Sequence, residues 1–167
     1  MKGDKKMELF DRLKLTEDYK LANGIILTRG TIGTCRQIDE EKKKYILQVP
    51  IFISNPPNVF IVTSVSIPDL ILEKVTMEDL NNYLSKNKNN YEHLTPRIYH
   101  INNLWSVKVG YDDNKNEIYK AGIIIKYNVQ LNENDDTVII KFFNNNLEKE
   151  YKKRYLEQFG SYSVIID

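Results

Sequence analysis

The clearest hydrophobic pattern in the chain lies within residues 118–143. Apolar residues occupy alternate positions from Ile123 to Leu131, and the positions between them are mainly polar. Successive side chains of a strand point to opposite faces, so this alternation predicts a strand with one buried face. Residues 134–136 are typical of a turn, and residues 137–143 predict a second strand. We therefore predict a β-hairpin across this region.

Further short apolar runs, rich in β-branched residues, predict additional strands. They span residues 25–38, 45–53, 59–67, 97–101, 104–111 and 161–166. The charged residues 39–44 predict the solvated tip of a long hairpin, and residues 112–117 predict a second tip. Gly30 and Gly33 predict a bulge or bend, and Pro50 predicts an edge strand or a break. Residues 59–67 are apolar on both parities, which predicts a central strand that is covered on both faces.

Three segments have helical patterns. Residues 4–15 predict a short N-terminal helix. Thr76 and Asp79 have the spacing of a capping box, which predicts a helix at Met77–Lys86. Residues 144–146 offer caps for a C-terminal helix that ends before Gly160 as its C′ residue. Four apolar residues repeat along it at every fourth position, with helical ion pairs beside them, and the last three of the four predict core packing. These are Leu147, Tyr151, Tyr155 and Phe159, with the pairs Glu148/Lys152 and Glu150/Arg154.

Together these elements predict a single α+β domain over residues 1–167, built from an antiparallel sheet of long β-hairpins and about three helices. The composition agrees with an ordinary globular protein, since 41% of residues are hydrophobic and 28% are charged. The formal charge of +1 gives no global attraction to nucleic acid or to a membrane. The single Cys35 and the absence of a signal-peptide pattern predict an intracellular (cytoplasmic) or virion location, not secretion.

Few residues in the chain suggest catalysis. Cys35 with His93 or His100 is the only cysteine–histidine combination, and an enzyme with an unrecognised site around Cys35 is one alternative. The same three residues lack the paired spacing of zinc ligands. Residues 112–117 begin like a calcium loop, but Glu117 stands where glycine is needed. We therefore predict no enzyme, no catalytic residue, no cofactor and no metal site.

Basic and aromatic residues alternate at several places, which suggests a second alternative, a nucleic-acid-binding module with exposed Tyr and Lys on a sheet face. Tyr45, Tyr99 and Tyr127 are its candidate residues. Gly30 and Gly33 have the spacing of the GXXG clamp, but their flanks predict strand where that clamp joins helices. Half-buried tyrosines beside solvated lysines are the simpler interpretation.

Because catalytic motifs are missing and long hairpins with polar tips can reach neighbouring molecules, we expect a non-catalytic structural or assembly subunit. We expect protein partners in a homo-oligomer or larger assembly, with no membrane partner. Small α+β proteins with projecting hairpins are frequent in viral particles. The AT-rich codon bias and the lack of motifs in this sequence also suit a fast-evolving phage. The specific expectation is a bacteriophage virion component such as a connector, neck or tail-completion protein, an expectation that rests on analogy of shape.

Overall fold

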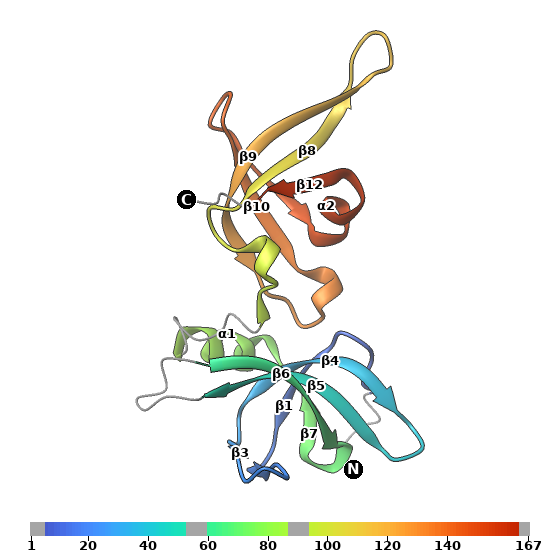
Figure 1. Cartoon of the computed structure of the whole chain (residues 1–167), viewed down its shortest axis with the longest axis vertical. Coiled ribbons are helices and arrows are strands. Elements are labelled where there is room, and N and C mark those ends of the chain that lie inside the picture. Colours follow the sequence, from blue (N-terminus) through green and yellow to red (C-terminus); the bar gives the residue numbers. More distant parts are fainter. Residues whose placement is uncertain (1–5, 53–59, 87–93, 164–167) are drawn as a thin grey trace. The chain divides into compact units, whose positions relative to one another are not determined.

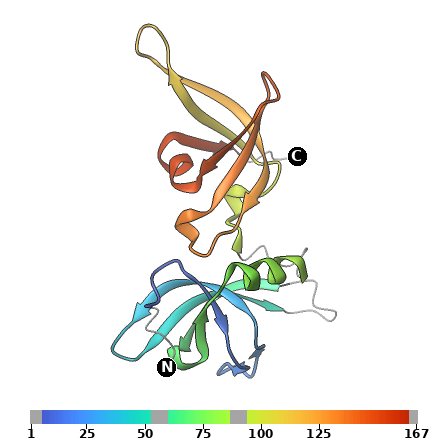
Figure 2. The ribbon, with the colours of Figure 1, turned by 180° about the vertical axis from the view of Figure 1, so that it is seen from behind.

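The computed structural model describes residues 6–52, 60–86 and 94–163 (Figures 1 and 2). The chain forms two compact units. Unit 1 comprises Met1–Leu94 and Gln130–Glu133, and unit 2 comprises Thr95–Val129 and Asn134–Asp167. The chain passes from one unit to the other three times, after residues 94, 129 and 133. The single-domain prediction stays a prediction, because two compact units can still unfold as one cooperative body.

Unit 1 contains a five-stranded antiparallel sheet in the order β6-β5-β4-β1-β7. Its strands are β1 (Arg12–Leu15), β4 (Ile32–Asp39), β5 (Lys44–Phe52), β6 (Phe60–Pro68) and β7 (Leu72–Lys74). The short strands β2 (Tyr19–Lys20) and β3 (Ile26–Leu27) form a separate pair. The predicted tip between β4 and β5 is confirmed, since the two strands pair up to Asp39 and Lys44. Inside, Leu13, Leu15, Cys35, Leu47 and Val49 share a core cluster and are fully buried.

The helix α1 (Met77–Lys86) of unit 1 has the predicted bounds. The Thr76 hydroxyl accepts a hydrogen bond from the Asp79 amide at 3.1 Å, and the Asp79 carboxylate accepts one from the Thr76 amide at 3.2 Å. This reciprocal pair is a capping box, and it satisfies two backbone donors at the helix start. Leu80 is fully buried and faces the interior. The local capping signal therefore sets where this helix begins, and the burial of Leu80 adds tertiary packing.

Unit 2 contains a second five-stranded antiparallel sheet, in the order β11-β10-β9-β8-β12. Its elements are β8 (Leu104–Tyr111), β9 (Glu117–Asn128), β10 (Thr137–Phe142), β11 (Glu148–Lys152), the helix α2 (Lys153–Phe159) and β12 (Gly160–Ser163). The core is aromatic. Tyr99 is fully buried and stacks on Trp105 with ring centroids 5.2 Å apart, and the Trp105 indole donates a hydrogen bond to the Ile98 carbonyl at 2.9 Å.

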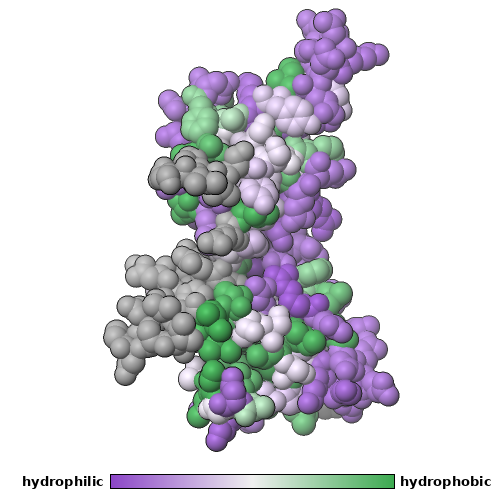
Figure 3. Space-filling view, in the orientation of Figure 1, coloured by the Kyte–Doolittle hydropathy of each residue, from purple (hydrophilic) through white to green (hydrophobic). Residues whose placement is uncertain are grey.

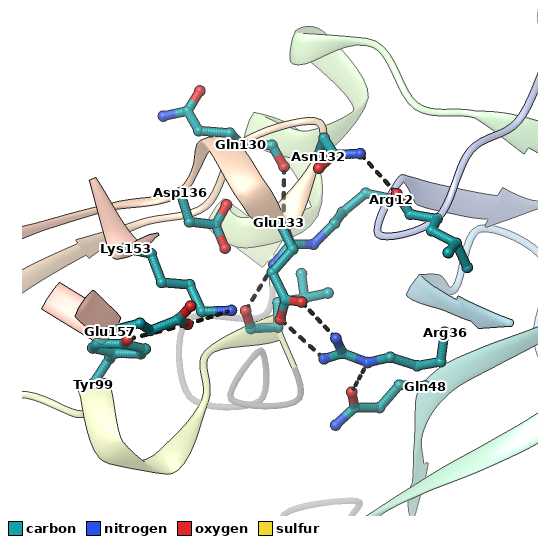
Figure 4. Close-up of polar contacts among 12 residues, drawn as sticks. Arg12, Arg36, Gln48, Tyr99, Gln130, Asn132, Glu133, Asp136, Lys153 and Glu157 are labelled. Atoms are coloured by element: carbon teal, nitrogen blue, oxygen red, sulfur yellow. Dashed lines mark hydrogen bonds and ion pairs between the residues drawn. The ribbon is translucent and has the colours of Figure 1, made fainter. Parts of the chain in front are cut away.

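The short segment Gln130–Glu133 belongs to unit 1 although it lies between β9 and β10 in the sequence. The Arg12 amide donates to the Leu131 carbonyl at 2.8 Å, and the Glu133 amide donates to the Phe10 carbonyl at 2.9 Å. The Arg36 guanidinium contacts both carboxylate oxygens of Glu133 and donates a further hydrogen bond to Gln48 at 2.7 Å (Figure 4). Backbone and charged contacts together fasten this segment to unit 1.

The α+β class with antiparallel sheets and β-hairpins is confirmed, but the helix count is not. In the described part of the chain there are two α-helices, because the predicted N-terminal helix is wrong. Phe10 has a φ of 69°, which no α-helix contains, and residues 12–15 form β1. The C-terminal helix is half correct: α2 begins only at Lys153, and residues 148–152 pair with β10 as β11. The predicted Glu148/Lys152 and Glu150/Arg154 helical pairs are therefore wrong.

Two strand predictions also fail. Residues 97–99 form a 3₁₀ helix and not a strand. The strand predicted to be central, β6, is at the edge of its sheet, where Ile61 is 50% exposed. The edge-strand prediction for Pro50 is wrong, because β5 lies between β6 and β4; Pro50 pairs with Val62 of β6, beyond the last pair of β5 with β4. Apolar residues at both odd and even positions of a strand therefore do not require that both faces of the strand are buried.

Several predicted details lie outside the described residues. These are the turn at 55–58, the polar connection at 87–92, His93 and the end of the last strand at 164–166. Neither described helix has the length and apolar character that a membrane span requires, and α1, the longer one, has only 10 residues.

Candidate functional site

The hairpin of β8 and β9 in unit 2 extends beyond the strands that flank it. β12 pairs with β8 only over residues 104–107, and β10 pairs with β9 only over residues 122–128. Residues 108–120 therefore form a two-stranded ribbon with no third strand in the described part of unit 2. We call these residues the hairpin arm, and in both views it continues past the rest of its sheet (Figures 1 and 2). A two-stranded ribbon is marginal alone, so local contacts must stabilise it.

Side chains on one face of the hairpin arm provide those contacts. The Lys108 ammonium lies 4.3 Å from the centroid of the Tyr111 ring, donates a hydrogen bond to its hydroxyl at 2.6 Å, and lies 3.4 Å from the Glu117 carboxylate. The Tyr119 hydroxyl donates to Glu117 at 2.6 Å. That hydrogen bond, and then the charge of Lys108, lowers the pKa of Glu117 below its usual value. Two cross-strand pairs, Lys108 with Tyr119 and Tyr111 with Glu117, place all four side chains on one face.

The outer surface of the hairpin arm combines a polar tip with exposed aromatic rings. Tyr111 is 61% exposed and Tyr119 is 48% exposed. Val109 is a bulge residue between Lys108 and Gly110, and it is also partly exposed. The tip is hydrophilic on the visible face (Figure 3). Large amphipathic rings on a projecting ribbon are suited to protein contacts, because tyrosine is enriched among the residues that dominate binding energy at interfaces.

The tip at residues 112–116 uses its acidic side chain to close its own turn. One carboxylate oxygen of Asp112 accepts the amides of Asn114 and Asn116 at 2.9 and 2.8 Å. These hydrogen bonds lower the pKa of Asp112, and the bond from the Asn116 amide has the largest effect. The prediction of a hairpin tip is confirmed. Among the described residues, no group of three His, Cys, Asp or Glu side chains is placed to hold a metal ion.

The structure makes Cys35 a poor candidate for a nucleophile. Its side chain is fully buried in the unit 1 core, and burial raises the pKa of the thiol to about 11. An activated cysteine needs the opposite shift, toward a thiolate at neutral pH. His100 belongs to unit 2, where its ring contacts the Thr95 carbonyl at 3.1 Å, and His93 lies outside the described residues. The structure therefore gives the Cys35 enzyme hypothesis no geometric support.

The three tyrosines proposed for nucleic-acid binding differ in their surroundings. Tyr99 is fully buried against Trp105 and cannot stack on a base. Tyr45 and Tyr127 are partly buried, and the Tyr127 hydroxyl donates to Asp136. Gly30 lies in a turn and Gly33 within β4, so no helix flanks either one. Among the described tyrosines, Tyr111, Tyr119 and Tyr162 are exposed. Tyr111 and Tyr119 flank the predicted tip, but the sequence alone does not show that they are exposed.

The predicted aromatic stripe near the C-terminus packs as expected although its secondary structure differs. Tyr151 in β11 stacks on Tyr155 in α2 at 5.4 Å, and Tyr155 contacts Phe159 at 4.9 Å. Tyr151 belongs to the unit 2 core, with Tyr155 packed against it. The core-packing prediction is confirmed for Tyr151 and Tyr155, whereas Leu147, the first residue of the predicted repeat, is 63% exposed.

The chain was also compared with known proteins. No protein-family model, no curated protein and no solved structure matches it.

Proposed function

We propose that this protein is a non-catalytic assembly subunit that binds a protein partner through the hairpin arm. The observation that carries the proposal is the ribbon at residues 108–120, which has no flanking strand among the described residues of unit 2 and exposes Tyr111 and Tyr119. A protein that acted alone would gain nothing from leaving two large rings on a ribbon that is marginal without support. A partner surface that covers both rings would stabilise the ribbon and bury apolar area.

The partner that we propose is another copy of this chain, within a homo-oligomer or larger assembly. The arm carries both signs of charge close together, with Lys108, Lys115 and Lys120 beside Asp112, Asp113 and Glu117. Such a balanced surface does not select a strongly charged partner such as a nucleic acid. The setting that we propose is a virion, with a bacteriophage connector, neck or tail-completion role, and this part rests on analogy of shape alone.

The test is light scattering after size-exclusion chromatography, over a range of protein concentrations and at two salt concentrations. We expect the wild-type protein to be an oligomer. The Tyr111→Ala/Tyr119→Ala variant should be a monomer, or its oligomer should have a dissociation constant about tenfold higher. The matched control is Leu147→Ala, which removes a 63% exposed apolar side chain of unit 2 outside the arm. An oligomer unaffected by the arm variant, or a wild-type monomer at every concentration, would contradict the proposal. A peak rich in nucleic acid that clears with salt would favour the nucleic-acid alternative.

A further inference from the structure

A polar pocket of about 400 Å³ lies in unit 1, away from the hairpin arm in the sequence. One wall is the turn 28–31 with Ile32, and another is a single face of α1. The helix residues recur at intervals of three, one and three positions, so they share one face. They are Asp79, Asn82, Tyr83 and Lys86, and Lys14 of β1 completes the lining.

The turn 28–31 is held in a defined conformation. The Thr31 amide donates to the Thr28 carbonyl at 3.1 Å, and Gly30 has a φ of +90°, which suits the third position of a type II turn. Leu15 fastens the turn to β1, since its carbonyl accepts the Gly30 amide at 2.9 Å and its amide donates to the Thr31 carbonyl at 3.0 Å. The Arg29 amide donates to Asp18 at 2.7 Å. The backbone thus fixes where the Thr28, Arg29 and Thr31 side chains begin.

The charges that line the pocket are mainly positive. Lys14, Arg29 and Lys86 oppose the single carboxylate of Asp79, which gives the lining a net charge of +2. Lys14 is already neutralised, because its ammonium lies 3.1 Å from Asp79 and 3.0 Å from Glu73. Arg29 and Lys86 are exposed, and within the described ranges neither side chain has an ion-pair partner. They are the two cations left to receive an anion.

The remaining lining groups are neutral and polar. The hydroxyls of Thr28 and Thr31 lie 3.4 Å apart, and one of them donates to the other, which leaves a hydroxyl proton for a ligand. Asn82 adds an amide that can donate or accept. Burial raises the pKa of Tyr83, so its phenol brings no negative charge at neutral pH. Nothing in the lining other than Asp79 opposes a negatively charged ligand.

We propose that this pocket binds a phosphomonoester dianion. A guanidinium group matches two phosphate oxygens with a bidentate fork, and an ammonium group supplies a point charge. Arg29 and Lys86, which have no ion-pair partner among the described residues, balance the two negative charges of a monoester, whereas a phosphodiester carries only one. The volume lies within the ordinary range for small-molecule sites, roughly 300–1,000 Å³. This site is independent of the assembly role proposed for the hairpin arm.

The test uses inorganic phosphate as the probe, in an NMR titration of backbone amides at constant ionic strength and slightly alkaline pH. We expect saturable shifts confined to residues 28–32 and 79–86. Arg29→Ala and Lys86→Ala should each weaken binding by about tenfold, the usual loss for one charge-assisted contact. Both side chains are exposed, so neither substitution should disturb folding. Unchanged amide shifts outside the pocket will verify that the variants fold.

The matched control is Lys42→Ala, which removes one exposed cation from the tip between β4 and β5 and should leave binding unchanged. Equal weakening in Lys42→Ala would overturn the proposal, because it would show attraction to overall charge. Dimethyl phosphate, a monoanionic diester, should bind at least tenfold more weakly than inorganic phosphate. Diester binding of equal strength, or shifts that do not saturate, would also overturn it.

Discussion

Arg36 and Glu133 form an ion pair that joins β4 to a segment 97 positions later in the sequence. The Glu133 side chain is only 3% exposed, whereas that of Arg36 is 31% exposed. Arg36 also donates to Gln48 and lies 5.8 Å from the centroid of the Phe10 ring. The pair is therefore asymmetric: one partner can reach water on its own and the other cannot.

This asymmetry predicts unequal costs for removing each partner. Arg36→Ala deprives a buried carboxylate of its bidentate donor and should cost about 3 kcal/mol of the free energy of unfolding. Glu133→Ala leaves a guanidinium that can be hydrated and should cost about 1–2 kcal/mol. Urea unfolding followed by far-UV circular dichroism measures both. The double variant should lose no more free energy of unfolding than Arg36→Ala alone. A larger loss for Glu133→Ala than for Arg36→Ala would show that the burial of Glu133 does not determine which substitution is more costly.

The interleaving of the two units predicts one cooperative unfolding transition. Gln130–Glu133 belongs to unit 1 but is joined directly to residues of unit 2 on both sides. Loss of unit 1 structure therefore releases both ends of the segment between β9 and β10. Trp105, the only tryptophan, reports on unit 2, whereas circular dichroism reports on both units. We expect the two signals to share one urea midpoint.

Arg36→Ala provides the decisive variant for this prediction, since its substitution lies in unit 1. If the chain is one domain, the variant lowers the midpoint of Trp105 fluorescence as much as that of the circular dichroism signal. A fluorescence midpoint that stays at the wild-type value while the dichroism splits into two steps would show two independent domains.

Local signals in the sequence predicted some elements well. The capping box of Thr76 and Asp79 located α1 to the residue, because each of its bonds joins atoms only three positions apart. The alternation in residues 104–111 and the polar tip after it gave β8 the correct bounds. These elements depend on neighbours in the chain, so the sequence contains the information directly.

Elements that depend on distant partners were predicted poorly. Residues 12–15 form a strand because β4 and β7 pair with them on both sides, and Leu13 and Leu15 alternate as a strand requires. β9 illustrates a second cause. Ile139 pairs with Lys126 but Ile140 pairs with Ile124, so Ile125 is a bulge that changes which face is buried. Ile124 is fully buried, against the alternation predicted from the sequence.

The candidate sites were also beyond the sequence. Tyr111 and Tyr119 are distinguished from other tyrosines only by the end of pairing at residues 107 and 122, which depends on where β10 and β12 stop. The pocket joins β1, a turn and α1, and no single stretch of sequence shows that these meet. Both features follow from strand order, which local patterns do not determine.

Asp79 predicts a pH dependence of stability. The amide hydrogen bond from Thr76, and then the contact with Lys14, lowers the pKa of Asp79 below its usual 3.8. The folded state thus favours the ionised form, so this contribution is fully present above pH 3.8 and is lost as the pH falls through the lower folded pKa. We expect Asp79→Asn to destabilise the protein at neutral pH, and the difference from wild type to disappear in strong acid.

Thr76 variants separate the capping contribution from the charge. Thr76→Ala should cost about 1 kcal/mol, the usual value for an N-cap, while Thr76→Ser retains the hydroxyl and should cost much less. Urea midpoints measured from neutral to strongly acidic pH test both statements. A difference between wild type and Asp79→Asn that grows in acid would reverse the sign and contradict the argument.

Cys35 predicts slow thiol chemistry in the folded protein. With the pKa of its thiol at about 11, only about one molecule in a thousand carries the thiolate at pH 8, whereas a thiol at the ordinary 9.0 carries about a hundred times more. Full burial further restricts access of a reagent. Alkylation by iodoacetamide should therefore be at least about a hundredfold slower in native buffer than in urea, with Cys35→Ser giving the background.

The reaction should proceed only as fast as the unit 1 core opens, so variants such as Arg36→Ala that lower stability should accelerate it. Rapid alkylation at neutral pH in the folded state would mean that the thiol is accessible and ionised, and it would restore the hypothesis of a nucleophile at this position.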